Sequence, residues 1–191
     1  AIVSVSADLP GSTGVADFQK AFPQNTQDIG VAESNMVSMA AGLAKLGYIP
    51  VVDTFAQFGV TKGGLPLTMA ALSQAPVIAI FSHVGFQDAA DGASHQALTY
   101  FAMANAIPHT RVYALSCSDE AEALVSQAVD DFAAKIKAGQ TPETYVFFLG
   151  RENFPPSYGA KNYSLDRAQV LRQGSGVVIA AAGAMIGEAL K

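Results

Sequence analysis

The chain has 191 residues, 50% of them hydrophobic and 14% charged, which is enough apolar material for one well-buried α/β domain and part of a second. A net charge of −5 without basic runs argues against a nucleic-acid surface or a membrane-surface helix. The single cysteine, Cys117, excludes an internal disulfide and a multi-cysteine metal site, and no apolar run approaches the ~18 residues of a membrane span. We therefore expect a cytoplasmic protein with Cys117 as a small buried side chain.

Strands and helices alternate along the first 150 residues, which predicts a mostly parallel sheet with helices on both faces. Pro76 to Ser82 is apolar without alternation, as in a central strand buried on both faces. Strands are expected at residues 1–6, 28–31, 48–53, 76–82, 111–115 and 144–149. Helices are expected at residues 17–22, 33–46, 65–74, 98–104 and 118–137, the last with Ser118 as its N-cap.

The helix that begins at Glu33 is apolar on almost every face, so we expect it to lie inside the protein. A carboxylate in a first turn can simply favour the positive end of the helix dipole. That explanation suits an exposed glutamate better than one that directly follows the apolar run Ile29 to Ala32, where a charge needs a partner or must protonate. Glu33 is therefore a candidate functional residue.

Further candidates follow the expected strands, where open α/β sheets hold their ligands. Phe55 and Phe58 lie in an expected loop, residues 55–59, and are either core residues or the walls of an aromatic pocket. His83 and His95 bracket an irregular, glycine- and acid-rich loop that contains Asp91, and such a long loop is usually functional. Structural histidines and a zinc site are the alternatives, although the spacing matches no usual ligand cluster.

Arg151 directly follows the last strand of this unit, where it is either a surface residue or a group that can fork a phosphate. Residues 150–173 read as a long connection, and a boundary is expected near Ser175. Residues 176–182 predict a new buried strand and residues 185–191 the start of a helix. Such a short piece cannot bury a core, so we expect a second domain that is truncated here. The dinucleotide, Walker and serine-hydrolase motifs are absent from the sequence.

Four motifs together resemble the pyrimidine-binding domain of transketolases, in that family's order and spacing over roughly residues 1–155. They are Gly30-Val31-Ala32-Glu33, Thr54-Phe55-Ala56-Gln57-Phe58, Ser82-His83 and Asp91-Gly92-Ala93-Ser94-His95-Gln96. The resemblance implies a parallel α/β domain that binds thiamine diphosphate at an interface with a separate diphosphate-binding domain. It assigns residues 1–155 to the pyrimidine-binding domain, 156–175 to a connecting segment and 176–191 to the start of a C-terminal domain.

The resemblance also implies a role for each matched residue. Glu33 would hydrogen-bond N1′ of the aminopyrimidine, Phe55 and Phe58 would surround that ring, and Asp8 would lie near it. Asp91 and His95 would contact the donor sugar at its C2 hydroxyl and C1 oxygen, and so belong with Glu33 to the catalytic set. The implied sugar-phosphate clamp consists of Ser12, His83 and Arg151. Two departures are Ser94 for the usual threonine and Thr61 where an aromatic residue often completes the pyrimidine pocket.

The family's metal- and diphosphate-binding motif, Gly-Asp-Gly followed by Asn, is absent from this sequence. The resemblance therefore implies a partner subunit that carries it together with Mg²⁺ or Ca²⁺, in a heterotetramer or around a homodimer of this domain. The implied activity is transfer of a two-carbon ketol unit between sugar phosphates of pentose-phosphate carbohydrate metabolism. A 1-deoxyxylulose-5-phosphate synthase, a 2-oxoacid dehydrogenase β subunit and a non-catalytic binding or regulatory paralogue are the alternatives.

Overall fold

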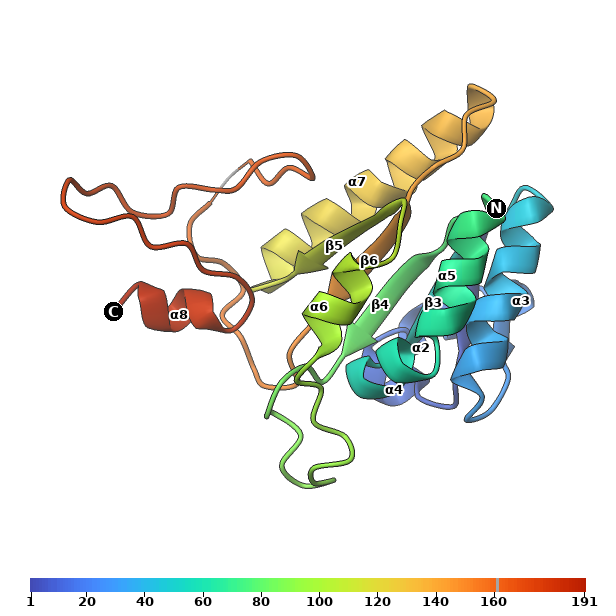
Figure 1. The fold of residues 1–191 in the computed structure, drawn as a ribbon, viewed down its shortest axis with the longest axis horizontal. Helices are drawn as coiled ribbons and strands as arrows, with labels where there is room; N and C mark the ends of the chain where they lie inside the picture. The colour runs from blue at the N-terminus through green and yellow to red at the C-terminus, as the bar shows by residue number, and fades with distance from the viewer. Residues whose placement is uncertain (161) are drawn as a thin grey trace.

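The computed structural model describes residues 1–160 and 162–191 and contains a six-stranded sheet in the order β2-β1-β3-β4-β6-β5 (Figure 1). All five strand pairs are parallel, which confirms the predicted α/β fold class. The strands are β1 Ile2–Ser6, β2 Thr26–Asp28, β3 Ile49–Phe55, β4 Ile78–Ser82, β5 Thr110–Ala114 and β6 Thr144–Phe148.

Helices connect the strands and cover both faces of the sheet. They are α1 Pro10–Thr13, α2 Ala16–Ala21, η1 Pro23–Asn25, α3 Glu33–Lys45, α4 Ala56–Thr61, α5 Gly64–Leu72, α6 Tyr100–Asn105, α7 Ser118–Lys137 and α8 Met185–Ala189. The long helix α7 has the bounds that the sequence predicted and lies along β5 and β6 in Figure 1. Its N-cap residue, however, is Cys117 and not Ser118.

Two hydrophobic cores fill the two faces of the sheet. Strand β6 contributes to both because alternate side chains of a strand point to opposite faces. Val146 and Phe148 pack into the core that α3, α4, α5 and α6 cover, whereas Tyr145 and Phe147 pack into the core that α7 covers. All five residues of β6 are buried, so the centre of the sheet provides a rigid base for the loops at its carboxyl end.

Three local predictions were wrong. Strand β2 covers residues 26–28 and not 28–31, and the expected loop at residues 55–59 forms helix α4, whose Ala56, Gly59 and Val60 are buried. Helix α3 begins at Glu33 as predicted but is not enclosed. Its buried residues are Glu33, Met36, Val37 and Ala40, and its small and polar residues keep one face exposed.

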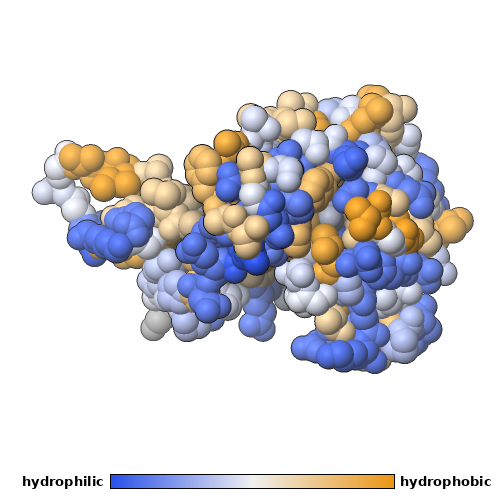
Figure 2. Space-filling view, turned by 90° about the horizontal axis from the view of Figure 1, so that it is seen from below, coloured by the Kyte–Doolittle hydropathy of each residue, from blue (hydrophilic) through white to orange (hydrophobic). Residues whose placement is uncertain are grey.

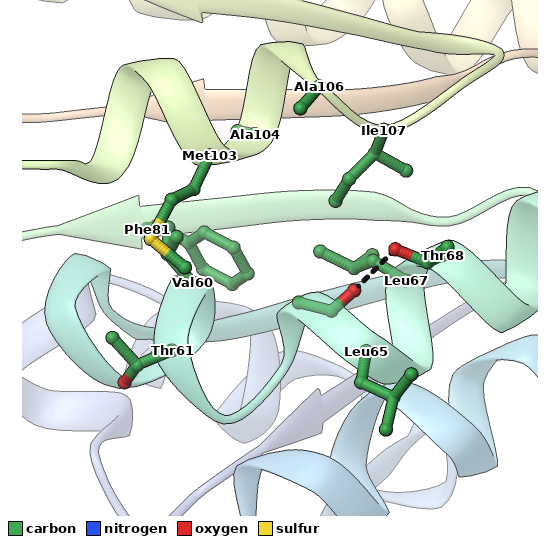
Figure 3. A pocket seen from close by; sticks show the side chains of 11 residues that line it. Val60, Thr61, Leu65, Leu67, Thr68, Phe81, Met103, Ala104, Ala106 and Ile107 are labelled. Carbon is green, nitrogen blue, oxygen red and sulfur yellow. Dashed lines mark hydrogen bonds between the residues drawn. The ribbon is translucent and has the colours of Figure 1, made fainter.

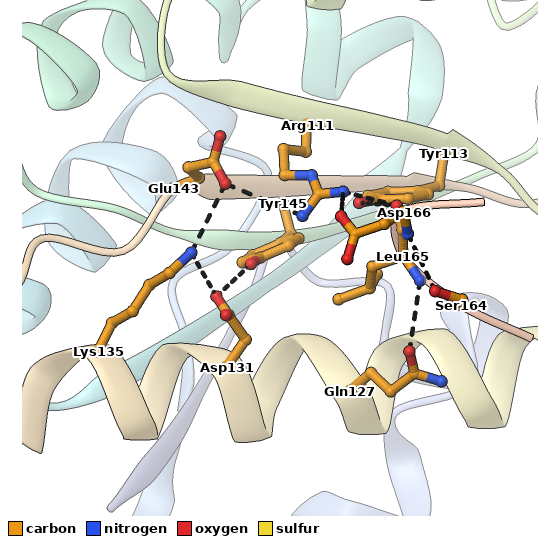
Figure 4. Close-up of polar contacts among 10 residues, drawn as sticks. All are labelled: Arg111, Tyr113, Gln127, Asp131, Lys135, Glu143, Tyr145, Ser164, Leu165 and Asp166. Atoms are coloured by element: carbon orange, nitrogen blue, oxygen red, sulfur yellow. Dashed lines mark hydrogen bonds and ion pairs between the residues drawn. The ribbon is translucent and has the colours of Figure 1, made fainter.

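The chain after β6 is tied to the sheet around Leu165 (Figure 4). The Arg111 guanidinium donates to the Leu165 carbonyl at 2.6 Å and pairs with the Asp166 carboxylate at the same distance. The side chain of Gln127 on α7 donates to the Tyr163 carbonyl at 2.9 Å and accepts from the Leu165 amide at 3.3 Å. Burial raises the pKa of the neighbouring Tyr113 to about 12, so this phenol stays protonated and can donate to Leu165.

Residues 176–182 are irregular and fully exposed, so the prediction of a buried strand there was wrong. Val177, Val178 and Ile179 are 81%, 94% and 70% exposed. This part of the chain projects from the body, and Figure 2 shows hydrophobic side chains on the projection. The residues favour a strand by composition but pair with no strand among residues 1–160 and 162–191, and a lone strand has no stability in water.

Candidate functional site

The site lies at the carboxyl ends of the neighbouring strands β1, β3 and β4. Asp8 follows β1, Phe55 ends β3 and His83 follows β4. The irregular loop from His83 to His95 extends below these strand ends in Figure 1, as the sequence predicted. Because parallel strands bring their carboxyl ends to one edge, residues distant in the sequence meet there.

Two phenylalanines and two histidines form one cluster at this edge. The rings of Phe55 and His83 stack with centroids 3.9 Å apart, and Phe58 meets His95 edge-on at 4.9 Å. Phe55 also lies edge-on to His95, at 6.3 Å. The structure thus brings together four of the residues that the sequence singled out, from β3, α4 and both ends of the loop.

His83 is the most constrained member of this cluster. It is buried, its backbone has the left-handed φ of 62°, and its Nδ1 lies 2.7 Å from the Ser82 hydroxyl. Burial lowers the pKa of His83 from 6.5, and nearby Asp88 opposes that shift. The imidazole is therefore neutral near pH 7 and can act as a hydrogen-bond partner without adding positive charge.

Glu33 opens α3 beside this cluster and is only 3% exposed. Its carboxylate makes no hydrogen bond or ion pair with another residue of the described chain. The next residue, Ser34, donates to the Lys62 carbonyl at 2.7 Å, which fixes the first turn of α3 against the end of α4, the helix that carries Phe58. The Glu33 oxygens are not among the fully enclosed polar atoms, so the carboxylate is open enough to accept a hydrogen bond from a ligand.

The Asp28 carboxylate holds Asp8 near the segment that precedes α3. The Asp28 carboxylate accepts from the Asp8 amide at 3.0 Å and from the Gly30 amide at 3.1 Å. The Asp8 backbone has a left-handed φ of 65°, and its side chain is exposed. Asp28 thereby holds the loop after β1 against the segment that precedes α3, so Asp8 and Glu33 lie on neighbouring segments at the carboxyl edge of the sheet.

Arg151 is paired with two carboxylates of the loop. Its guanidinium contacts Asp88 and lies 3.9 Å from an Asp91 oxygen, and its backbone amide donates to the Gln87 side chain at 2.7 Å. Ser12 is exposed on α1, a helix that contacts β3 and β4. No contact between Ser12 and either His83 or Arg151 occurs in residues 1–160 and 162–191, so the structure does not bring these three residues together.

Two acids are buried that the sequence did not single out as such: Asp53 was not considered, and Asp88 was considered only with Asp91 as an acid of the loop in the zinc alternative. Asp53 on β3 is fully buried and accepts from Ser6 at 2.8 Å and from Thr13 at 2.6 Å, and burial raises its pKa. The only acid inside the apolar run of residues 49–55 was a signal that could have identified it. Asp88 is also fully buried, but nothing in its sequence surroundings distinguishes it from the exposed acid Asp91.

An apolar hollow of about 300 Å³ lies away from these residues, between α4, α5 and α6 (Figure 3). Val60, Leu67, Phe81 and Ile107 line it together with Thr61, the residue that stands in place of the usual aromatic. Within the described ranges, no three His, Cys, Asp or Glu side chains are placed to hold a metal ion. No described helix is both long and apolar enough to cross a membrane.

Comparison with known proteins identifies the family to which this fold and its candidate site belong. A family model described as "Transketolase, pyrimidine binding domain" matches residues 1–151. The chain belongs to the transketolase family. The match covers the whole sheet, the cluster of four rings and Glu33, so this edge is that of a transketolase pyrimidine-binding domain.

Individual relatives agree with this assignment. A 6-deoxy-6-sulfo-D-fructose transketolase subunit from Clostridium sp. (strain MSTE9) is 30% identical over 99% of the chain, which covers 56% of that protein. A 1-deoxy-D-xylulose-5-phosphate synthase from Clostridium acetobutylicum is 27% identical over 99% of the chain, which covers 29% of that protein. The solved structure "Split gene transketolase, inactive beta4 tetramer" matches with a TM-score of 0.74 and 31% identity, and the chain covers 58% of it. This chain thus spans between about a third and three-fifths of these relatives.

The transketolase family consists of thiamine diphosphate enzymes, and the residues present fit the pyrimidine end of that cofactor. Glu33 offers a carboxylate acceptor that no described residue uses, and Phe55 and Phe58 offer aromatic rings at the same edge of the sheet. An aminopyrimidine ring needs both an acceptor for a ring N–H group and apolar walls for its faces. Nothing comparable for a diphosphate group occurs in the part of the chain that the structure describes.

Proposed function

We propose that this chain is the pyrimidine-binding half of an enzyme that transfers a two-carbon ketol unit between sugars on thiamine diphosphate. The observation that carries the proposal is Glu33, a residue only 3% exposed at the start of α3, whose first turn is bonded to the end of the helix that bears Phe58. None of the described hydrogen bonds or ion pairs that hold the fold together uses the Glu33 side chain, so a glutamate there is not needed for folding. Binding of a ligand that donates a hydrogen bond is the function that this free carboxylate supports.

Each residue of the edge has a proposed task. Glu33 holds a proton between its carboxylate and the pyrimidine N1′, and Phe55, Phe58 and Asp8 position that ring. The cofactor, when bound, supplies the carbanion chemistry, and the chain positions it and excludes water. Asp91 and His95 contact the hydroxyl groups of the donor sugar. Ser94 supports His95, whose Nδ1 lies 3.0 Å from the Ser94 hydroxyl.

A partner subunit is proposed to complete the site with the diphosphate- and metal-binding residues, in a heterotetramer or around a homodimer of this domain. One support is the name of the 30% identical relative, a transketolase subunit. Another is the exposed apolar surface on α5 and α6, where Leu65 is 72%, Met69 52% and Met103 42% exposed. Leu65 and Met103 line the hollow of Figure 3, and a protein surface over α5 and α6 would bury these apolar side chains.

The remaining proposals concern the setting of the enzyme. A cytoplasmic location, Mg²⁺ or Ca²⁺ on the partner, and sugar phosphates bound by Ser12, His83 and Arg151 are part of the proposal. So is the division of the chain into residues 1–155, 156–175 and 176–191. The synthase relative makes a 1-deoxyxylulose-5-phosphate synthase the second candidate. A non-catalytic paralogue is disfavoured because it would have no use for an unpaired Glu33.

Calorimetry tests the proposal. Thiamine diphosphate with Mg²⁺ is titrated into this chain alone and then into its equimolar mixture with the subunit that carries Gly-Asp-Gly and Asn. Because residues 1–160 and 162–191 offer no site for the diphosphate, binding should be weak alone and strong in the mixture, where ketol transfer should also appear. Equally strong binding to the chain alone, or a mixture that neither binds nor transfers, would refute the split site.

A further inference from the structure

The short helix α1 is attached to the sheet by a hydrogen bond of the Thr13 side chain. None of the four residues of α1 is buried, and the amides of Ser12 and Thr13 bond to the Leu9 carbonyl within the same segment. The Thr13 hydroxyl, however, lies 2.6 Å from a carboxyl oxygen of Asp53 on β3. In the described residues this is the only hydrogen bond between residues 9–14 and the sheet. Asp53 is therefore the polar group that fixes α1 against the strands.

The hydrogen bonds around Asp53 are all satisfied when its carboxyl group carries a proton. The Thr13 hydroxyl has one proton but two oxygens within reach, that of Asp53 at 2.6 Å and the Leu9 carbonyl at 2.9 Å. A protonated Asp53 donates to Thr13, Thr13 then donates to Leu9, and the Ser6 hydroxyl still donates to Asp53 at 2.8 Å. The other Asp53 oxygen is buried without a partner in the described residues, which is less costly for a neutral group than for a charged one. Burial, the largest influence on the pKa of Asp53, raises it in agreement.

The place of Ser12 depends on this bond, whereas the place of Asp8 does not. Ser12 directly precedes Thr13 on α1 and is exposed. The Asp8 amide, just before the helix, donates to the Asp28 carboxylate at 3.0 Å, so Asp8 has an attachment of its own. Loss of the bond between Thr13 and Asp53 should therefore release Ser12 while Asp8 stays in place.

We infer that Asp53 is a positioning residue that holds α1 through the Thr13 hydroxyl and thereby sets the place of Ser12 at the carboxyl edge of the sheet. The inference rests on the proposed function, in which Ser12 binds the sugar phosphate, and adds to it two residues that do not touch the ligand. It differs from a purely structural role of Asp53, because it predicts weaker sugar binding with unchanged cofactor binding when the bond to Thr13 is removed.

Hydrogen–deuterium exchange on this chain tests the attachment of α1 without any ketol transfer. Thr13→Val keeps the shape of the side chain but removes the hydroxyl, so the amides of residues 11–14 should exchange about tenfold faster than in the parent. Thr13→Ser restores the hydroxyl and should return the exchange rate to within about twofold of the parent. Asp53→Asn should also stay within about twofold, because the amide group can donate to Thr13 in place of the protonated carboxyl group.

Two controls isolate the pair. The Thr26 hydroxyl donates to the Phe22 carbonyl at 3.1 Å, four residues earlier, as Thr13 does to Leu9, but it bonds no carboxyl group in the described chain. Thr26→Val should therefore leave exchange at residues 11–14 within about twofold. In a chain that already carries Asp53→Ala, Thr13→Val should have no further effect, because the group it bonds is gone. Exchange in Thr13→Val equal to that of the parent, or an undiminished effect of Thr13→Val beside Asp53→Ala, would overturn the inference. If Asp53→Ala folds poorly, Thr13→Val alone decides.

Kinetics test the consequence for the ligand, in the complex of this chain with its diphosphate-binding partner, thiamine diphosphate and Mg²⁺. Thr13→Val should raise KM for ribose 5-phosphate about tenfold and leave both kcat and the dissociation constant of thiamine diphosphate within about twofold. An unchanged KM, or a loss of cofactor affinity as large as the rise in KM, would overturn the inference. If no complex transfers a ketol unit, the proposed function fails, and the exchange measurement still decides whether Asp53 holds α1.

Discussion

Gly59 is where α4 packs against β4, and replacing it with alanine should destabilise the fold and disturb the site together. A Cβ at Gly59 would lie 2.7 Å from two ring carbons of Phe81, closer than carbon atoms approach in proteins. Phe81 is fully buried and its ring lies 6.0 Å from that of Phe148, so the only space beside it is the apolar hollow of Figure 3 that it lines. We expect helix α4 to shift as well, which would move Phe58, the residue it carries, relative to His95.

The matched control is Gly42→Ala on the exposed face of α3, where a Cβ would meet nothing within 4 Å. Both changes add the same methyl group and the same helix propensity, which is worth about 1 kcal/mol. The difference between the two variants therefore measures the overpacking at Gly59, for which we expect about 1–3 kcal/mol. For a chain of this size that difference corresponds to about 2–12 °C in Tm, with Gly59→Ala the less stable variant.

Thermal and urea unfolding followed by far-ultraviolet circular dichroism measure this difference, since the chain has no tryptophan. The complex with the partner should also bind thiamine diphosphate more weakly when it carries Gly59→Ala. Equal stability of the two variants would refute the argument, because it would mean that Phe81 can move aside without loss.

Three further changes probe buried ionisable groups. Glu33→Gln should leave the fold intact and lower ketol transfer by a factor of about 100 to 10,000, the usual contribution of an acid–base group; near-normal turnover would contradict the role proposed for Glu33. Burial raises the pKa of Asp53, so its contribution to stability is present at low pH and is lost as pH rises through that raised value. Asp53→Asn should therefore gain stability relative to the parent between about pH 4 and pH 7 in urea unfolding, and a constant difference would count against it. Burial lowers the pKa of His83 from 6.5, so the stability that the neutral imidazole contributes is present above pH 6.5 and is lost as the pH falls. His83→Gln should therefore reduce the loss of stability on acidification. An unchanged pH profile would show that His83 is not the group responsible.

Local patterns were sufficient to predict most of the elements. Helix α7 combines acidic residues in its first turn with regular apolar positions over 20 residues, and its bounds were predicted without error. The strand Ile78–Ser82 was recognised by its continuous apolar run. Such elements are determined by residues close in the sequence, so tertiary contacts only confirm them.

The errors arose where distant residues decide the outcome. Helix α4 has only six residues and contains Gly59, and it is stabilised by close packing on Phe81, which follows more than 20 residues later. Residues 176–182 are rich in valine and alanine, but the folded chain offers them no neighbouring strand. The pairing of Asp88 with Arg151 joins positions 63 residues apart, so no local pattern distinguishes Asp88 from the other acids of its loop.

The left-handed backbone of Asp8 and His83 has an evolutionary consequence. Each of these residues lies just after a strand, at φ of 65° and 62°, where a side chain other than glycine costs on the order of 1 kcal/mol or more. Glycine or asparagine would relieve this strain. A lineage that no longer needed these side chains would thus gain stability by drifting to glycine or asparagine at both positions, while the apolar strands before them stayed the same. A descendant chain that retains the strained aspartate and histidine would therefore be one still under selection for ligand binding at this edge of the sheet.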